Sequence, residues 1–372
     1  MPTIRLDDLS DVERRAYVIA DNRLAELAGW DREILRIELQ GLAELDLGFD
    51  MEITGFDTTA LDLLLDDDID AAAPDPADEI PPPEPGPAIT RPGDIWLMGD
   101  HRLLCGDARD SSDIERLMAG ETARMVFTDP PYNVKIDGHV GGAGKTKHRE
   151  FAIASGEMSR DAFTQFLTEV RGHMAGASCD GAIHFVCMDW RHMAELQAAG
   201  NAVYDELKNL IVWAKTNGGM GTFYRSQHEL IFVFKKGRAA HINNFGLGET
   251  GRYRTNVWTY PGINSFRNGR DDELAMHPTV KPVALVADAI KDVSKRGDIV
   301  LDAFGGSGTT LIAAAKTGRK ARLLELDPIY CDVICRRFQA YTGAPALRAE
   351  DGVRFSEFEA SQKSSEDAEV VS

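Results

Sequence analysis

The chain has 372 residues, of which 43% are hydrophobic and 27% are charged, so it can bury a sizeable core and form two or three domains, or one large domain with appendages. Its formal net charge of −19, taken over the whole chain, argues against binding to the phosphates of a nucleic acid. The charge is unevenly distributed: residues 1–93 carry a net −16, residues 94–355 a net +1, and residues 356–372 a net −4. The acidity therefore belongs to the two ends, and the long middle part is neutral.

The sequence favours neither a membrane segment nor a metal site. No apolar run approaches the roughly 20 residues of a membrane-spanning helix, and the N-terminus lacks the pattern of a signal peptide. We therefore expect a cytoplasmic protein without membrane association. Cys331 and Cys335 are four residues apart on a predicted helix, but no second cysteine or histidine pair has ligand spacing. They are interpreted as packing residues, and no metal ligand is predicted.

Three short helices are predicted near the N-terminus. Apolar residues recur at helical spacing over 12–30, in one broken helix or a pair, and Asp31 can cap a second amphipathic helix. A third helix is expected over Thr58 to Leu65. We predict a small helical unit over residues 1–65.

Residues 66–93 differ from the helical unit in composition. They are acidic and rich in proline, and such a segment forms no core of its own. We predict an extended, solvated linker that acts as a spacer.

Strands and helices alternate from residue 94 onward. Strands are expected at 95–98, 102–105, 123–128, 181–187, 208–213, 229–234, 298–304 and 321–326, and helices at 159–175, 190–199, 282–293, 308–317 and 328–341. This alternation is typical of a doubly wound, mainly parallel α/β sheet. We predict one such domain over 94–355, followed by a polar tail over 356–372.

A glycine-rich turn, Asp302 to Thr310, joins a predicted strand to a predicted helix. Ligands bind outside the carboxyl ends of strands in a doubly wound sheet, and glycine lets the backbone approach a ligand closely. No lysine follows the glycines, which disfavours an ATP-binding loop. Glu325 ends the next strand, where a carboxylate can accept both hydroxyl groups of a ribose; the alternative is a surface carboxylate that caps the following helix.

Asp129-Pro130-Pro131-Tyr132 follows another predicted strand. The Asp129 carboxylate and the Pro130 carbonyl are acceptors that the prolines fix in place. Two fixed acceptors suit an exocyclic amino group, which has two N–H donors, and Tyr132 can stack on a planar base. The structural alternative is a proline turn with an aromatic plug.

At these residues the chain resembles the S-adenosylmethionine-dependent amino-methyltransferases of DNA. Residues 129–132 are similar to the DPPY catalytic motif of that family, and residues 302–309 to its cofactor loop, D-x-F-x-G-x-G-T. The catalytic motif comes first, which is the circularly permuted order of the β class. Residues 277–282 are similar to the HPTxKP element of that class, and Gly106-Asp107 to its G-D element. Four motifs in this order extend the resemblance over residues 94–355.

The resemblance implies a Rossmann-like, circularly permuted methyltransferase sheet that uses S-adenosylmethionine to methylate double-stranded DNA at a specific site. It implies a catalytic site made of Asp129, Pro130, Pro131 and Tyr132. It implies cofactor contacts from Asp107, His277, Lys281, Asp302, Phe304, Gly306, Gly308, Thr309 and Glu325. DPPY is similar to adenine-N6 enzymes, whereas cytosine-N4 enzymes more often carry serine in place of the aspartate. A homodimer and a restriction–modification setting are typical of the family and are expected here.

A basic stretch lies where the β class has its target-recognition region, predicted over 208–275. Residues 208–270 hold ten basic and two acidic residues, a net +8. Aromatic residues suited to stacking on bases are interleaved with them, namely Phe223, Tyr224, Tyr253, Trp258 and Tyr260. The predicted DNA contacts are Lys215, Arg225, Arg252, Arg254, Arg267 and Arg270, with Lys145 and Lys147 from a glycine-rich loop over 141–149.

The N-terminal unit has a resemblance of its own. Residues 16–24 are similar to the later half of a ParB-like nuclease domain, which is often fused to such methyltransferases. The phosphate-binding segment of that domain would lie before Met1, so no nuclease activity is expected. The alternative functions are a cytosine-N4 DNA methyltransferase, a methyltransferase of RNA or small amines, and a non-catalytic DNA-binding protein of the partition type.

Overall fold

The structure of the 372-residue chain is a computed structural model that describes residues 9–24, 31–43, 45, 49–66, 75–134, 154–216, 218, 223–246, 252–262 and 280–361. The chain divides into two compact units. One unit comprises residues 1–71 together with 244–254, and the other comprises 72–243 and 255–372. Within the described ranges, no helix has both the length and the apolar composition needed to cross a membrane.

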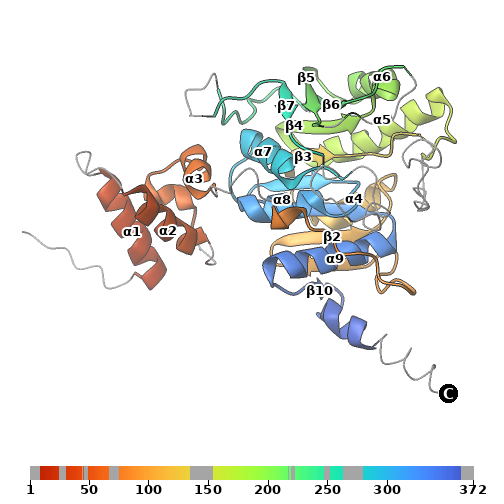
Figure 1. Cartoon of the computed structure of the whole chain (residues 1–372). Coiled ribbons are helices and arrows are strands. Elements are labelled where there is room, and N and C mark those ends of the chain that lie inside the picture. The colour runs from red at the N-terminus through yellow and green to blue at the C-terminus, as the bar shows by residue number, and fades with distance from the viewer. Residues whose placement is uncertain are drawn as a thin grey trace, which may run out of the picture. The chain divides into compact units, whose positions relative to one another are not determined.

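The N-terminal unit is a small cluster of helices (Figure 1). It contains α1 (Asp11–Leu24), α2 (Arg32–Ala43), the 3-10 helix η1 (Met51–Thr54) and α3 (Thr58–Leu65). Their core consists of Ile19, Leu35, Leu39, Leu42, Met51, Phe56 and Leu61. Asp31 accepts hydrogen bonds from the backbone N–H groups of Glu33 and Ile34 and thereby caps α2. The three predicted helices are confirmed, and η1 is added.

The second unit is built on one ten-stranded sheet in the order β10-β1-β2-β9-β8-β3-β4-β6-β5-β7. The five parallel strands at its centre are β2 (His101–Cys105), β9 (Lys320–Glu325), β8 (Ile299–Asp302), β3 (Ala123–Thr128) and β4 (Ser178–Met188). The remaining strands are β1 (Ile95–Met98), β5 (Glu206–Ala214), β6 (His228–Lys235), β7 (Val257–Thr259) and β10 (Leu347–Arg348). The predicted α/β class is confirmed, with antiparallel strands on both sides of a parallel centre.

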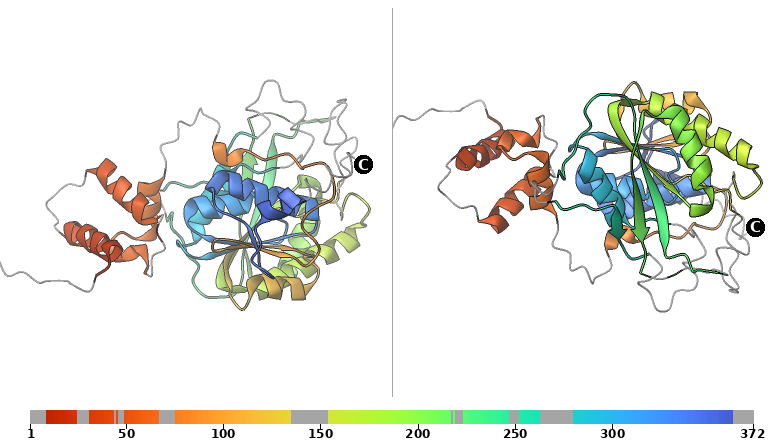
Figure 2. Two further views of the ribbon diagram at one scale, coloured as in Figure 1. Left: turned by 90° about the horizontal axis from the view of Figure 1, so that it is seen from below. Right: turned by 90° about the horizontal axis from the view of Figure 1, so that it is seen from above.

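Helices cover both faces of this sheet (Figure 2). On one face lie α7 (Val283–Val293), α8 (Thr309–Thr317) and α9 (Pro328–Thr342), and on the other α4 (Ser111–Met118), α5 (Arg160–Gly176) and α6 (Met193–Val203), which the 3-10 helix η3 (Trp190–His192) precedes. Alternate residues of β3 pack on opposite faces of the sheet, because successive side chains of a strand point in opposite directions. Met125 and Phe127 pack with α7–α9, and Val126 packs with α4–α6.

The elements α4, β7 and β10 were not predicted from the sequence. The N-cap of α4 is Asp110, which accepts a hydrogen bond from the Ser112 N–H at 2.9 Å, and its buried residues are Ile114, Leu117 and Met118. This is a regular helix-start signal, and it was missed because the helix has only eight residues. β7 and β10 have three and two residues, too few to show an alternating pattern.

The prediction of a solvated linker is wrong for residues 75–91, called here the acidic strap. Ala77 is 1% exposed and Ile89 is 9% exposed, and both belong to the core on the α7–α9 face. A short 3-10 helix, η2 (Pro76–Asp78), forms within the strap. Composition did not reveal this, because the few apolar side chains of the strap are buried against helices distant in sequence and form no core of their own.

Polar contacts fix the acidic strap to α7, α8 and α9. Asp332 of α9 accepts hydrogen bonds from the backbone of Ile89 (2.8 Å) and Thr90 (2.9 Å) and from the Thr90 hydroxyl (2.6 Å). Asp78 accepts the N–H of Val283 at the start of α7, at 2.8 Å. Asp75 pairs with Lys316 of α8 at 2.8 Å. The strap is therefore packed as part of the sheet unit.

Candidate active site

The predicted motifs lie side by side at one edge of the sheet. β2, β9, β8 and β3 are neighbours that run in the same direction, so their carboxyl ends meet at this edge. Asp107 comes just after the end of β2, Glu325 and Asp302 are the last residues of β9 and β8, and Asp129 comes just after the end of β3, in that spatial order. Four carboxylates that are distant in sequence are thereby aligned along the edge where doubly wound sheets bind ligands.

Asp302 fastens the glycine-rich loop to the neighbouring strand β3. Its carboxylate accepts hydrogen bonds from the hydroxyls of Thr128 (2.9 Å) and Thr310 (2.6 Å) and from the N–H of Phe304 (3.1 Å). Burial raises the pKa of Asp302 to about 7, against the effect of these hydrogen bonds. Thr128 is the last residue of β3 and precedes Asp129, so this contact joins the two predicted motifs.

The loop itself depends on glycine. Gly306 and Gly308 have φ of 51° and 84°, in the left-handed region that glycine adopts without strain. A Cβ on Gly308 would lie 3.1 Å from Ile334 of α9, so the space behind the loop is already filled. Phe304 packs edge-on against Phe166, with 6.1 Å between ring centroids.

Arg337 of α9 supports the loop from inside the protein. Arg337 is 2% exposed; its guanidinium donates to the Ser307 carbonyl at 2.9 Å and lies 3.3 Å from the hydroxyl of Thr309. Its other end donates to the carbonyl of Ala77 in the acidic strap at 2.8 Å. One buried cation therefore links the loop to the strap.

Glu325 and Asp107 present carboxylates on adjacent strands. Glu325 accepts the N–H groups of Gly306 (2.7 Å) and Asp327 (2.8 Å), and burial raises its pKa to about 7. Burial also raises the pKa of Asp107, but hydrogen bonds from Arg109 bring it below its ordinary value. Here a glycine backbone lies between carboxylates that can accept hydrogen bonds. Such a site fits a nucleoside that carries a positive charge and whose ribose hydroxyl groups donate hydrogen bonds.

A cluster of ionisable side chains surrounds Asp129. Lys281 Nζ is 2.5 Å from Asp129 Oδ2, and the Tyr132 hydroxyl donates to Asp129 Oδ1 at 2.5 Å. Glu229, the second residue of β6, places Oε2 3.0 Å from Lys281 Nζ and 3.2 Å from the Tyr132 hydroxyl. Lys215, which follows β5, pairs with the other oxygen of Glu229. The cluster contains two carboxylates and two ammonium groups, so its formal charges balance.

Burial and charge act in opposite directions on these groups. Burial raises the pKa of Asp129 even with the Lys281 ammonium against it. Burial would lower the pKa of Lys281, but the carboxylates of Asp129 and Glu229 raise it above its ordinary value. Burial also raises the pKa of Tyr132, with the two carboxylates adding to the shift. The tyrosine therefore keeps its proton and acts as a donor.

Pro130 is buried and Pro131 half-buried, and the residue after the motif is held firmly. Asn133 has a φ of 53° and donates from Nδ2 to the Met158 carbonyl at 2.9 Å. Its Oδ1 accepts the N–H groups of Gly156 and Met158 at 3.1 and 3.2 Å. Asparagine adopts a positive φ more readily than most residues, so an asparagine directly after Tyr132 is the local signal that sequence inspection could have used.

Several of the predicted site residues make contacts other than those expected from the sequence. Lys281, predicted to contact the cofactor, has its ammonium against Asp129, and Lys215, predicted to contact DNA, is paired with Glu229. Glu229 was missed, although a lone carboxylate at the start of a strand in a basic region was a usable signal. His277, Lys145, Lys147, Arg267 and Arg270 lie outside the described residues.

The other residues predicted to contact DNA differ in how exposed their side chains are. Arg225 is exposed and donates to the Gly218 carbonyl at 2.7 Å, whereas Arg252 is buried and Arg254 half-buried. Phe223 and Tyr224 are 87% and 84% exposed, and their ring centroids are 4.5 Å apart. Trp258 and Tyr260 instead pack with the core, and Tyr253 is exposed.

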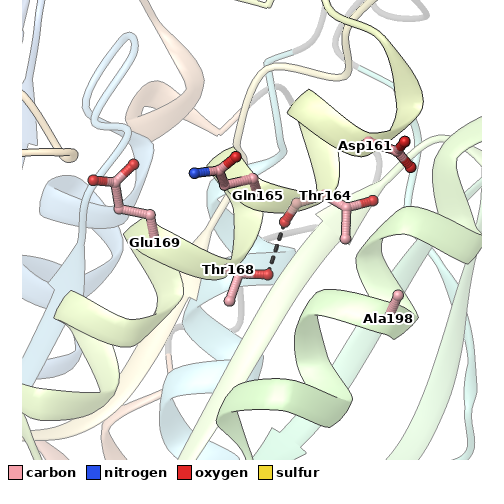
Figure 3. Close-up of a pocket in the computed structure, with 6 residues that line it drawn as sticks. All are labelled: Asp161, Thr164, Gln165, Thr168, Glu169 and Ala198. Carbon is pink, nitrogen blue, oxygen red and sulfur yellow. Dashed lines mark hydrogen bonds between the residues drawn. The ribbon is translucent and has the colours of Figure 1, made fainter.

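A groove of about 710 Å³ lies elsewhere on the surface, along α5 and α6 (Figure 3). It is lined by Asp161, Thr164, Gln165, Thr168, Glu169 and Ala198. The Thr168 hydroxyl in this groove donates to the carbonyl of Thr164 at 2.7 Å. No residue of the predicted motifs lines it, so we do not assign the groove to the cofactor or to the base.

Comparison with known proteins agrees with this geometry. Residues 123–336 match the family model of the N6/N4 DNA methylases, described as DNA methylase, and residues 33–92 match a ParB-methyltransferase HTH domain. The chain is 26% identical over 262 residues to the DNA adenine methyltransferase YhdJ of Escherichia coli K12, a match that covers 63% of this chain and 81% of the relative.

Two solved structures are similar at lower identity. One is TTHA0409, a putative DNA modification methylase of Thermus thermophilus, with 23% identity, 68% of this chain and 97% of that one covered, and a TM-score of 0.45. The other is the PvuII DNA methyltransferase, described as cytosine-N4-specific, with 16% identity, coverage of 65% and 87%, and a TM-score of 0.48.

The family model spans more than half of the chain, and its range includes Asp129, Glu229, Lys281 and the glycine-rich loop after β8. The ParB relationship expected at the N-terminus is confirmed, and the matched model is a helix-turn-helix domain whose range includes the acidic strap. The chain therefore belongs to the N6/N4 DNA methylase family, with S-adenosylmethionine as its cofactor, and carries a ParB-methyltransferase helix-turn-helix domain.

Proposed function

We propose that this protein is a site-specific DNA methyltransferase that methylates N6 of an adenine flipped out of the duplex. The observation that carries the proposal is the position of Asp129 at the end of β3, joined to the cofactor loop through the Thr128–Asp302 hydrogen bond. The DPPY form of the motif and the likeness to an adenine methyltransferase support adenine as the base.

The chemistry requires an oriented amino group. S-adenosylmethionine supplies a methyl group on a positively charged sulfur. Asp129 and the Pro130 carbonyl would accept the two N6 hydrogens, which draws the nitrogen lone pair out of conjugation with the ring. Tyr132 would stack on the base, and Asp129 is positioned to take the proton that the nitrogen releases. The rate enhancement would come from orientation and preorganised charges, without a covalent intermediate.

Flipping the base costs a few kcal/mol of stacking and pairing, so the protein must bind the duplex around it. The turn between β5 and β6 emerges at the catalytic edge, because Met188 at the end of β4 pairs with Leu230 of β6 and Ala214 at the end of β5 pairs with His228. Phe223 and Tyr224 lie in that turn. We infer that this exposed aromatic pair and Arg225 meet the DNA beside the flipped base.

A cytosine-N4 methyltransferase is the second candidate. Its substrate also carries an exocyclic amino group with two donors, and the matched family includes both chemistries. The acceptors at Asp129 and Pro130 would serve either base. We also propose that the protein forms a homodimer, the state that its resemblance to this class implies.

The test is the Asp129→Ala variant. We expect methyl transfer to duplex DNA to fall at least about 1,000-fold, because both orientation and proton acceptance are lost, with S-adenosylmethionine binding retained. Transfer of a radiolabelled methyl group to duplex DNA, RNA and small amines measures the activity. Titration calorimetry measures the binding of S-adenosylmethionine.

The matched control is Asp189→Ala. Asp189 follows the neighbouring strand β4, and its side chain is 22% exposed, the same fraction as that of Asp129. The control should keep its activity. Turnover of Asp129→Ala near that of the control would contradict the assignment.

A further inference from the structure

Both oxygens of the Asp129 carboxylate are already engaged by side chains of the protein. Oδ2 is paired with Lys281 at 2.5 Å, and Oδ1 accepts the hydroxyl of Tyr132 at 2.5 Å. Transfer to an exocyclic amino group needs at least one of these oxygens as an acceptor. An incoming base must therefore displace a partner, and a displaced, mostly buried ammonium needs another anion nearby.

Glu229 is positioned to receive both displaced groups. Its Oε2 is 3.0 Å from Lys281 Nζ and 3.2 Å from the Tyr132 hydroxyl, so each can exchange carboxylates with little movement. The side chains of Lys281 and Glu229 are 4% and 12% exposed, so water cannot easily take over this role. β6 holds the glutamate in place, because Glu229 pairs with Trp213 in the β5–β6 ladder.

Glu229 is ionised, as a carboxylate that accepts the displaced ammonium and hydroxyl groups must be. Burial would raise its pKa, but the ammonium groups of Lys281 and Lys215 lower it to about 2. The groups that face it are Lys215 after β5, Lys281 before α7, Asp129 and Tyr132 after β3, and the thiol of Cys187 on β4. It stays ionised throughout the neutral range.

We propose that Glu229 is a positioning residue that takes Lys281 and Tyr132 from Asp129 when the substrate amino group enters, and so frees the catalytic carboxylate. Lys215 holds the second oxygen of Glu229 and keeps the carboxylate ionised. The inference rests on the proposed transfer to an exocyclic amino group but not on which base carries it. No bond other than hydrogen bonds and ion pairs changes in this step.

The main test is Glu229→Gln in the full-length protein. Without the anion, Lys281 stays on Asp129, and we expect kcat to fall about 100-fold with the KM for DNA within about threefold. S-adenosylmethionine affinity by calorimetry should stay within about twofold, because Glu229 has no contact with the cofactor loop among the described residues. Glu229→Asp, which keeps the charge, should recover part of kcat.

A double variant distinguishes the proposed exchange of partners from a purely structural role of Glu229. In the double variant Glu229→Gln/Lys281→Met the competing cation is absent, so kcat should be higher than in Glu229→Gln alone. The control is Glu121→Gln, another ion-paired glutamate, which lies before β3 at the opposite edge and contacts Arg322. It should keep its kcat.

A pH profile gives a readout that does not need a folded Glu229→Gln variant. Lys215→Met removes one of the two cations that lower the pKa of Glu229, so protonation at acidic pH should now abolish exchange. We expect its kcat to fall more steeply than the wild-type kcat below about pH 6 and to recover at pH 8.

Two results would overturn the inference. One is a kcat of Glu229→Gln within threefold of wild type. The other is an equal loss in Glu229→Gln and the double variant together with an unchanged pH profile of Lys215→Met, which would indicate structural support only. Wild-type assays on adenine and cytosine substrates report separately on the proposed function, so its failure cannot be mistaken for either result.

Discussion

Two carboxyls at the carboxyl edge of the sheet, Asp302 and Glu325, have pKa values near neutrality, and they differ in what they can do. Asp302 has three hydrogen-bond donors from its own chain, so its role is to hold the loop on the catalytic strand. Glu325 has two backbone donors and lies half-buried at the strand end, where a ribose is expected. The sequence predicted the position of both residues but could not distinguish these roles.

The raised pKa of Glu325 predicts a pH-dependent cofactor affinity. Its folded pKa of about 7 lies above the ordinary 4.5, so the cofactor-free protein favours the neutral carboxyl and loses stability as pH rises from about 4.5 to about 7. Ribose hydroxyls donate better to the ionised form. Affinity for S-adenosylmethionine should therefore rise about tenfold from pH 6 to pH 8, with proton release at pH 6 measured by calorimetry in two buffers.

The control for this effect is Glu325→Gln, which cannot ionise. Its affinity should be weaker and nearly independent of pH over the same interval. Asp302, whose pKa burial also raises to about 7, remains in the variant and reports any contribution of its own. A flat wild-type profile, or a variant with the wild-type slope, would exclude Glu325 as the titrating cofactor contact.

Periodicity and turn residues predicted most of the strands and helices of the sheet domain, and the motif order placed the catalytic and cofactor loops at one edge. Short elements such as β7 were missed because three residues carry no pattern. The acidic strap was predicted to be solvated because its anchors, Asp332 and Arg337, lie more than 200 residues away in sequence. Glu229 reaches Asp129 only through the register of β6 against β4 and β5, which no local pattern contains.

The acidic strap predicts a coupling between stability and cofactor binding. Arg337→Gln removes the cation that joins Ala77 to Ser307 and leaves buried carbonyls without their donor. We expect the free energy of unfolding to fall by about 2–4 kcal/mol and S-adenosylmethionine affinity to fall about tenfold, measured by chemical denaturation and calorimetry.

The adjacent Arg336→Gln is the matched control. Arg336 lies on the same helix but pairs with Glu359 at 2.6 Å, away from the loop. The variant should keep its affinity for S-adenosylmethionine. If both variants bind the cofactor equally well, the strap does not support the loop.

At the scale of the whole molecule, the net charge of −19 comes from the two acidic ends of the chain and does not report the charge of the surface that meets the substrate. The acidic N-terminal region and tail flank a neutral catalytic domain, and the basic stretch 208–270 lies within it. The family match to the helix-turn-helix domain ends at residue 92, whereas packing assigns residues 75–91 to the sheet unit. By packing, the structural boundary between the two units therefore lies before the acidic strap, near residue 72.

Long-read sequencing of DNA from cells that express the protein tests the central claim most directly, because it reports the modified base and the target site together. We predict N6-methyladenine at one recurrent sequence in cells with the wild-type protein, and none in cells with Asp129→Ala. N4-methylcytosine at the recurrent site would contradict the adenine assignment, and an unmodified genome with the wild-type protein expressed and folded would contradict the proposed activity.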